Sequence, residues 1–366
     1  MNYCDPAKTA EILRPKMMKG GKYLISRISG AGQAPGEEKI LEDYFRYKDY
    51  IDNKEWAEGG QQKRWDPKFL GLSENRDGDI QNIKKLEFQN PAYSAARSMG
   101  GDPKDYNKVF TVQIAGCDLD CNYCFVPKQL NCADKRFGRY FSAEEIVRHF
   151  LTARAASVEP MNVLRISGGN PTILPEIILD VYQAMKKNDV RAYLWIDSNL
   201  STLEYLDWMG KDFKEMLRQK NVGVVGCFKG TNERDFSLIC GAGPEYYERQ
   251  FKVLNWFLEQ GTDIYVYLPA LVYSDVESNL SGFAKKLFNM NKNLPLRTEL
   301  LAIIDYPGAK INFERAAKLG RPMPETSQRE VFETWHNKVL PQLYSPDELQ
   351  KYCCQAPLYQ SFKWIG

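Results

Sequence analysis

The chain has 366 residues, of which 43% are hydrophobic and 26% are charged, so it can bury a substantial core. Its 49 Lys and Arg residues nearly balance its 47 Asp and Glu residues, which argues against a dedicated nucleic-acid-binding protein but leaves room for a local basic patch. Only two His residues are present, which argues against sites built on several His side chains, and no apolar stretch is long enough to predict a membrane span.

The first part of the chain, residues 1–106, differs in composition from the rest. It is polar, and its apolar residues come in short groups between loops rich in Gly and Pro. Residues 40–50 have the pattern of a short amphipathic helix. Because Tyr, Phe and Trp recur throughout, we expect an irregular N-terminal extension packed on the main domain rather than a disordered tail.

From residue 107 onwards, apolar β-rich runs alternate with helical segments. The runs predict strands at 109–115, 163–167, 192–196, 222–228, 263–268 and 298–304. The segments between and after them predict helices at 142–157, 175–187, 202–220, 244–260, 275–290 and 326–339. This α/β alternation predicts a parallel sheet with right-handed crossovers. Six units favour a partial (β/α)6 TIM-type barrel over residues 107–305, followed by a short helical extension at 306–366, with an open doubly wound sheet as the alternative.

Cysteines provide the clearest chemical signal. Nine are present, an odd number, without a secretory signal, which favours reduced thiols or metal ligands in a cytoplasmic protein. Cys117, Cys121 and Cys124 follow the first predicted strand with the spacing C-x3-C-x2-C. Three thiolates on one loop suit an iron–sulfur cluster, and a [4Fe–4S] cluster with three ligands leaves one iron open. Structural zinc, with Cys132 as the nearest fourth ligand, and three unrelated buried thiols are the alternatives.

This motif, with an aromatic residue before its last cysteine and a strand in front of it, resembles that of the radical S-adenosylmethionine (radical SAM) enzymes. The resemblance implies that Cys117, Cys121 and Cys124 hold a [4Fe–4S] cluster whose open iron chelates SAM. It implies that SAM is cleaved to methionine and a 5′-deoxyadenosyl radical, which takes a hydrogen atom from the substrate. It also implies that Tyr123 packs against the adenine of SAM.

Motifs at the ends of later strands extend the resemblance. The Gly-Gly-Asn-Pro at 168–171 is a turn when taken alone, but it is similar to the family's Gly-Gly-Glu-Pro, whose backbone binds the SAM amino group. The Asp-Ser-Asn at 197–199 and the Cys-Phe-Lys at 227–229 resemble the Asp-Thr-Asn and Asp-Leu-Lys of glycyl-radical-enzyme activases. The lysine of that last motif would pair with the SAM carboxylate. The implied SAM-binding residues are therefore Tyr123, Gly168, Gly169, Asn170, Asp197, Ser198, Asn199 and Lys229.

The remaining cysteines show no second C-x2-C run, so free buried thiols are expected for most of them and an auxiliary cluster is the alternative. Cys227 differs from the others because it lies at a strand end that faces the expected cavity. It is the candidate for a thiol that acts on a substrate radical, and no other catalytic residue is assigned.

Together these features predict a radical SAM enzyme, most similar to glycyl-radical-enzyme activases, whose substrate is a protein or peptide. Its cofactors would be SAM and a [4Fe–4S] cluster, and its partner a reductant such as flavodoxin or ferredoxin. A small molecule or tRNA is the alternative substrate. For tRNA, the Tyr- and Lys-rich N-terminal region could bind RNA. A non-catalytic iron–sulfur electron carrier and a zinc-stabilised binding protein are the alternatives from other classes.

Overall fold

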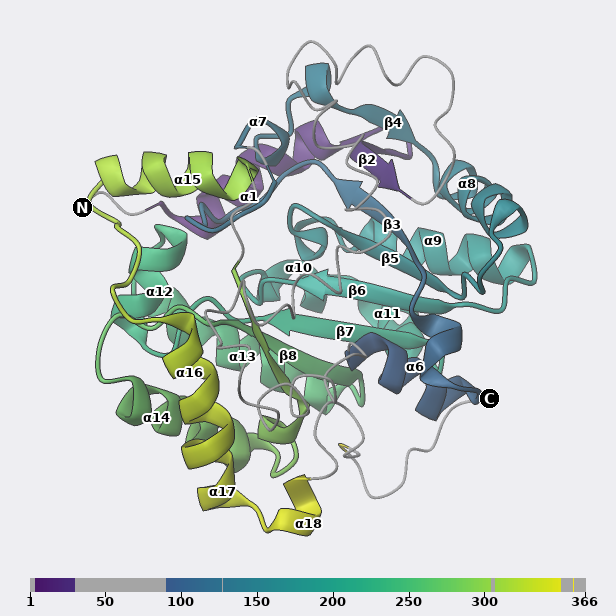
Figure 1. Ribbon diagram of the computed structural model, residues 1–366. Coiled ribbons are helices and arrows are strands. Elements are labelled where there is room, and N and C mark those ends of the chain that lie inside the picture. Colours follow the sequence, from purple (N-terminus) through teal and green to yellow (C-terminus); the bar gives the residue numbers. More distant parts are fainter. Residues whose placement is uncertain (1–3, 30–89, 127, 304–306, 350–357, 359–366) are drawn as a thin grey trace.

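The computed structural model describes residues 4–29, 90–126, 128–303, 307–349 and 358 (Figure 1). One sheet forms its centre, with the strand order β1-β2-β3-β5-β6-β7-β8-β9 and with β4 paired to β2. From β3 to β9 each strand pairs in parallel with the next one along this order. These parallel strands are β3 (Val109–Ile114), β5 (Val163–Gly168), β6 (Tyr193–Ser198), β7 (Val222–Cys227), β8 (Asp263–Pro269) and β9 (Thr298–Leu301).

This strand order confirms the predicted partial barrel. A doubly wound sheet reverses its strand order at a switch point, whereas here the order follows the sequence without reversal. The sheet is not closed, because no pairing joins its two ends within the described residues. All six predicted strands are present, and the last of them is shorter than expected, ending at Leu301.

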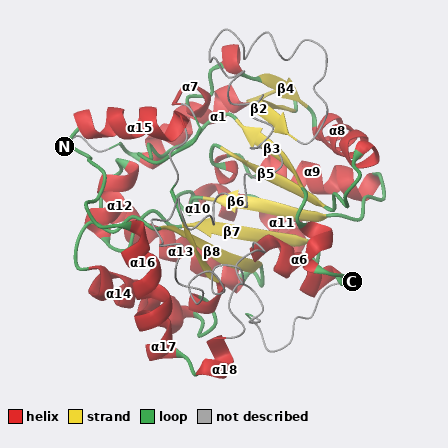
Figure 2. Cartoon of the chain, in the orientation of Figure 1, coloured by secondary structure: helices red, strands yellow, loops and turns green. Residues whose placement is uncertain are grey.

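Helices cover the outer face of the sheet (Figure 2). A capping box begins the helix predicted at 142–157, because the Ser142 side chain accepts from the Glu145 backbone N–H and the Glu145 side chain accepts from the Ser142 backbone N–H. The helices between strands are α7 (Lys128–Asn131), α8 (Ala143–Ala156), α9 (Glu176–Lys187), α10 (Leu203–Trp208), α11 (Gly210–Leu217), α12 (Glu233–Cys240), α13 (Glu245–Glu259) and α14 (Val276–Met290).

The inner face of the sheet carries a separate, aromatic-rich cluster. Tyr193, Trp195, Tyr265 and Tyr267 point to this face because strand side chains alternate, and helix α6 (Asn90–Met99) packs against them. In Figure 1 this helix lies at the amino ends of β6 and β7. The carboxyl ends of the strands lie at the opposite edge of the sheet.

The N-terminal extension is more regular than its composition predicted. It contains α1 (Pro6–Met17), β1 (Met18–Lys19) and β2 (Lys22–Ser29), and β2 pairs antiparallel with both β3 and β4 (Arg139–Phe141). The sequence pattern missed these strands because they are short or mixed in polarity, and pairing with the edge of the parallel sheet stabilises them. The helix predicted at 40–50 lies outside the described residues.

Two predicted helices are interrupted, and several others were not predicted. The segment expected at 202–220 divides into α10 and α11, with Gly210 at a positive φ of 72°. The segment expected at 326–339 begins as α16 (Gln328–Thr334) and passes through a π-helix (Trp335–Val339) into α17 (Leu340–Leu343). The short α12, α15 (Pro307–Lys318) and α18 (Pro346–Leu349) were missed. Among the described residues, no helix is long and apolar enough to cross a membrane.

Candidate active site

The cysteine loop begins directly after β3, at the carboxyl edge of the parallel sheet. Backbone bonds hold its start, because the N–H of Gly116 donates to the carbonyl of Leu130 at 3.0 Å and that of Cys117 donates to the carbonyl of Asn131 at 2.9 Å. The Asn131 side chain also donates to the sulfur of Cys124, at 3.7 Å. Helix α7 therefore runs back along the loop and fixes both of its ends.

The three thiols of the loop are half-buried and free. Burial raises the pKa of all three, that of Cys121 to about 12, and nearby Cys121 and Cys124 raise the pKa of Cys117 further. The thiolates thus repel one another and need a positive group to stabilise them, as a metal centre would provide. No three His, Cys, Asp or Glu side chains in the described part of the chain lie close enough to hold a single metal ion. In a [4Fe–4S] cluster with three cysteine ligands, each thiolate binds its own iron.

Asp118, between the first two cysteines, lies in a network of neutral donors. Its carboxylate accepts from the side-chain amides of Asn170 at 2.9 Å and Asn199 at 2.8 Å, and from the hydroxyl of Ser201. Burial raises the pKa of Asp118, and these three donors offset the increase only in part. The Asn170 oxygen accepts from the Thr172 hydroxyl at 2.8 Å, so this amide is fully used within the protein. A glutamate at position 170 would instead bring a second carboxylate beside Asp118.

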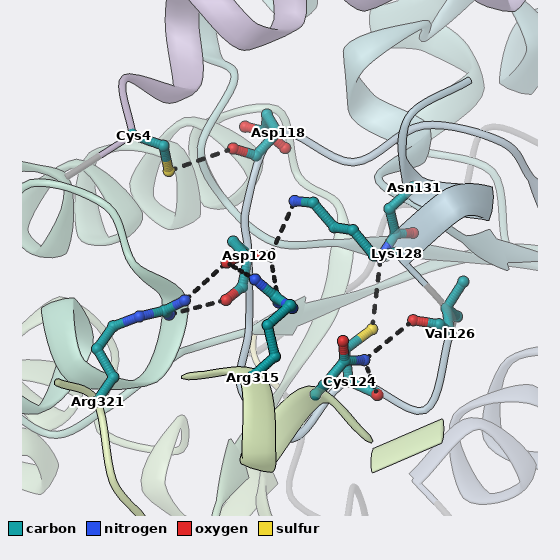
Figure 3. A network of polar contacts seen from close by, with 10 residues as sticks. Cys4, Asp118, Asp120, Cys124, Val126, Lys128, Asn131, Arg315 and Arg321 are labelled. Carbon is teal, nitrogen blue, oxygen red and sulfur yellow. Dashed lines mark hydrogen bonds and ion pairs between the residues drawn. The ribbon is translucent and has the colours of Figure 1, made fainter. Parts of the chain in front are cut away.

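Asp120, two residues later, lies among cations (Figure 3). Its two carboxylate oxygens accept from the guanidinium of Arg315 at 2.7 and 2.8 Å, from Arg321 at 2.6 Å, and from the Lys128 ammonium at 2.8 Å. Burial raises the pKa of Asp120, but the bonds and charges of Arg315 and Lys128 outweigh it and hold the pKa below its usual range. Asp120 therefore ties the cysteine loop to α15 and to the turn that follows it.

Packing inside the protein requires the two glycines of the Gly-Gly-Asn-Pro motif, Gly168 and Gly169. A Cβ on Gly169 would lie 1.8 Å from the carbonyl oxygen of Gly116, just before the first cysteine of the loop. Gly168 has a φ of 95°, and a Cβ there would meet Gln113. The N–H of Asn170 donates to that same Gly116 carbonyl at 2.8 Å. The absence of side chains at these glycines thus lets the end of strand β5 pack against the start of the cysteine loop.

The residues predicted at the end of β6 point in different directions. Asp197 faces the inner surface, where Arg165 binds it at 2.6 Å and the Ser167 hydroxyl also donates to it. Ser198 is buried, with its hydroxyl against that of Thr172. The Asn199 amide, by contrast, lies 3.9 Å from the sulfur of Cys117.

Lys229 comes from the end of β7 and reaches the cysteine loop. Its ammonium donates to the hydroxyl of Tyr123 at 3.1 Å and lies 5.6 Å from the centre of that ring. Burial lowers the pKa of Lys229, but Tyr123, Cys121 and Cys227 more than offset this and raise it above its usual value. Among the described residues no carboxylate forms an ion pair with Lys229. The site thus contains a half-buried cation beside the thiols that no carboxylate in the described part of the chain neutralises.

Cys227 lies near both Lys229 and the Arg165–Asp197 pair. Its thiol is half-buried on the inner side of the sheet, and burial raises its pKa to about 11. Its carbonyl accepts from the amide of Gln250 at 3.2 Å, which also donates to the Asn199 carbonyl at 2.7 Å. Gln250 therefore clamps the ends of β6 and β7 together.

Sequence reasoning missed four residues that organise this site. Asp118 and Asp120 lie within the motif, but nothing in the spacing distinguishes one from the other. Gln250 did leave a signal, because it is a polar residue on the otherwise apolar buried side of α13. Arg165 left the same kind of signal within an apolar strand.

Comparison with known proteins identifies a domain within the chain. Residues 112–281 match the model of the Radical SAM superfamily, and this range includes all three cysteines of the loop and Lys229. The chain therefore contains a radical SAM domain, as the motif predicted. Proteins of this superfamily bind a [4Fe–4S] cluster and SAM, and the match to this domain supports an enzymatic function.

Curated relatives differ in their activities. The 7-carboxy-7-deazaguanine synthase of Bacillus subtilis (strain 168) is 31% identical over 102 residues, 28% of this chain and 38% of that protein. The pyruvate formate-lyase-activating enzyme of Clostridium pasteurianum is 21% identical over 201 residues, 55% of this chain and 76% of that protein. The second match is consistent with the predicted likeness to activases, whereas the two together leave the substrate class open.

Solved structures also resemble the chain. Streptococcus suis SuiB bound to S-adenosylmethionine aligns with a TM-score of 0.46 and 16% identity, covering 83% of this chain and 60% of that one. The chain thus spans less than two thirds of the length of both SuiB and the Bacillus synthase.

Proposed function

We propose that this chain is a radical SAM enzyme in which Cys117, Cys121 and Cys124 hold the [4Fe–4S] cluster and Lys229 binds the SAM carboxylate. The observation that carries the proposal is the half-buried Lys229 ammonium beside the cysteine loop, which has no carboxylate partner among the described residues. A buried cation requires an anion, and the carboxylate of a bound amino acid would supply it. Bound in this way, SAM supplies a 5′-deoxyadenosyl radical that abstracts hydrogen from the substrate.

The other predicted residues then have distinct parts in binding SAM. Tyr123 would pack against the adenine while its hydroxyl orients the Lys229 ammonium. At Gly168, Gly169 and Asn170 the backbone would face the SAM amino group, because the Asn170 side chain is buried and its oxygen already accepts from Thr172.

The Asp197–Ser198–Asn199 segment would support the same cofactor from the end of β6. Asn199 lies beside Cys117, and Asp197 is oriented by Arg165 toward the inner face. The buried Ser198 hydroxyl would hold the turn by its bond to Thr172 rather than touch SAM.

Cys227 is proposed as the thiol that exchanges hydrogen with a substrate radical. Its side chain lies on the inner side of the sheet, next to Lys229 and the Arg165–Asp197 pair. The raised pKa of Cys227 keeps the thiol protonated at neutral pH, which is the form that can give a hydrogen atom.

A protein or peptide is the proposed substrate, supported by the match to the pyruvate formate-lyase-activating enzyme. A small molecule is the second candidate, because one of the curated relatives is the 7-carboxy-7-deazaguanine synthase of Bacillus subtilis. A flavodoxin or ferredoxin is the proposed reductant, and a cytoplasmic setting is the one in which the free thiols would stay reduced.

The test is anaerobic SAM cleavage. The protein is reconstituted with iron and sulfide, reduced with dithionite and given SAM, and 5′-deoxyadenosine is measured by mass spectrometry. We expect product from the wild type and from Cys132→Ala, an exposed thiol outside the motif, but none from Cys121→Ala. Equal product from wild type and Cys121→Ala, or none from the wild type with a full complement of iron and sulfide, would refute the proposal.

A further inference from the structure

Three exposed apolar side chains lie on α15, at its end, or directly after the cysteine loop that α15 contacts. Ile311 and Leu319, on α15 and at its end, are 60% and 57% exposed, and Phe125, directly after the last cysteine, is 40% exposed. Large apolar side chains that gather in this way on a surface mark interaction sites more often than isolated ones do. The α15 face is defined here as Phe125, Lys128, Ile311, Arg315, Lys318 and Leu319.

Helix α15 is bonded directly to the cysteine loop. The Asn312 side chain donates to the carbonyl of Cys124 at 2.7 Å and to that of Val126 at 3.4 Å. One turn later, Arg315 binds both carboxylate oxygens of Asp120. The α15 face therefore lies over the segment that carries the proposed cluster ligands, and Phe125 lies beside the last of them in the chain.

The α15 face is positively charged around its apolar side chains. A single carboxylate, that of Asp120, is shared among the cations Lys128, Arg315 and Arg321 (Figure 3). Lys318 is exposed and forms no ion pair among the described residues, while Glu314 is the one exposed acid on the described part of α15. Cations therefore outnumber carboxylates here, which complements an acidic partner.

We propose that the α15 face is the docking site of an acidic electron-transfer protein that reduces the cluster. The proposal rests on the proposed function, since it presupposes a cluster on the cysteine loop. One electron passes from the reduced donor to the cluster, so the donor is oxidised by one electron, the cluster is reduced by one, and no bond forms or breaks. The apolar side chains exclude water from the contact, and the surrounding cations orient the acidic donor.

The test compares two double variants that make the same chemical changes. Ile311→Asp with Lys318→Glu alters the α15 face at two exposed positions whose side chains form no hydrogen bond or ion pair with the described part of the loop. Val158→Asp with Lys187→Glu is the matched control, at exposed positions near the amino edge of the sheet. The probe is a flavodoxin of net negative charge, and its affinity for the reconstituted protein is measured by calorimetry at low and high salt.

We expect the α15 double variant to bind the flavodoxin about ten-fold more weakly than wild type, and the control to bind like wild type. Wild-type affinity should fall as salt rises, and the α15 variant should show a smaller fall. Affinity and salt dependence equal to those of wild type would overturn the proposal. If the double variant fails to fold, as judged by its unfolding transition, Lys318→Glu alone gives the same comparison with a smaller expected change.

Chemical reduction separates this proposal from the proposed function. Dithionite is small and does not need the α15 face, so it should support 5′-deoxyadenosine formation equally in the double variant and the wild type. Flavodoxin-driven formation should fall in the double variant only. If dithionite gives no product with wild type, the proposed function fails, and the binding measurement still decides whether the face takes an acidic protein.

Discussion

Two aspartates only two residues apart in the cysteine loop have opposite surroundings. Asp118 is buried and accepts hydrogen bonds from the neutral groups of Asn170, Asn199 and Ser201, and its pKa is raised. Asp120 is shared by three cations, and its pKa is lowered. The fold thus favours a neutral group at the first position and a charged one at the second.

This difference shows that the loop is held from two sides by different physical means. Asp118 joins the loop to the ends of β5 and β6, inside the protein, where salt has little access. Asp120 joins it to α15 and the turn after it, by partly exposed ion pairs. We therefore expect the attachment through Asp118 to depend on its hydrogen-bond acceptor oxygens, and the attachment through Asp120 to depend on its negative charge.

The largest effect is expected from Asp120→Ala, which removes the one carboxylate that three cations share. Because Arg321 is nearly buried and would lose its anionic partner, we expect a loss of about 3 kcal/mol in the free energy of unfolding, measured with urea. Glu215→Ala, which breaks an exposed ion pair with Lys211, is the control and should leave the unfolding midpoint unchanged. A loss no larger than that of the control would show that the cations do not hold the loop.

Asp118→Ala should cost somewhat less, about 2 kcal/mol, because it leaves buried amide and hydroxyl donors without their acceptor while other partners remain. The same urea titration measures it, and iron retained after reconstitution should fall as well, since Asn199 also lies against Cys117. Stability unchanged by this substitution would contradict the role assigned to the network.

Substitution by asparagine sharpens the contrast, because it removes the charge and keeps the shape. Asp118→Asn should stay within about 1 kcal/mol of wild type, since the raised pKa shows that the fold disfavours the charged form there. Asp120→Asn should lose more, because its environment favours the charged form. Equal losses in the two variants would mean that the surroundings of the two aspartates do not differ as described.

Salt should give the smallest effect. Raising NaCl to 1 M should reduce the cost of Asp120→Ala by about 0.5 kcal/mol, because the ion pairs of Lys128 and Arg315 are partly exposed. The cost of Asp118→Ala should not change. Paired denaturation curves at two salt concentrations measure both, and a salt-sensitive Asp118→Ala would count against the neutral network.

Much of the fold follows from the sequence. The parallel strands are continuous apolar runs that alternate with helical segments, and this alternation predicts the partial barrel. The spacing of the cysteines predicts the loop that follows β3. Strands β1, β2 and β4 could not be predicted in the same way, because they depend on pairing with other strands. Strand β2 pairs with β3, and β1 and β4 pair with β2.

The candidate site was predictable in its motifs but not in its connections. The spacing of the three cysteines predicted that they lie together, and the likeness to known motifs predicted that Lys229 lies near them. The bond between Asp118 and Asn170 joins residues 52 positions apart, and that between Asp120 and Arg315 joins residues 195 apart. Such pairs leave no local pattern, so only the folded chain shows why Asn170 stands where the family motif has Glu.

The most direct test of the central claim, that the cysteine loop holds a cluster with an iron open to SAM, is electron paramagnetic resonance of the dithionite-reduced protein before and after SAM is added. We predict a cluster signal in the wild type that changes when SAM binds, a signal unaffected by SAM in Lys229→Met, and no signal in Cys121→Ala. A wild-type signal that SAM leaves unchanged would contradict the account and favour an electron carrier.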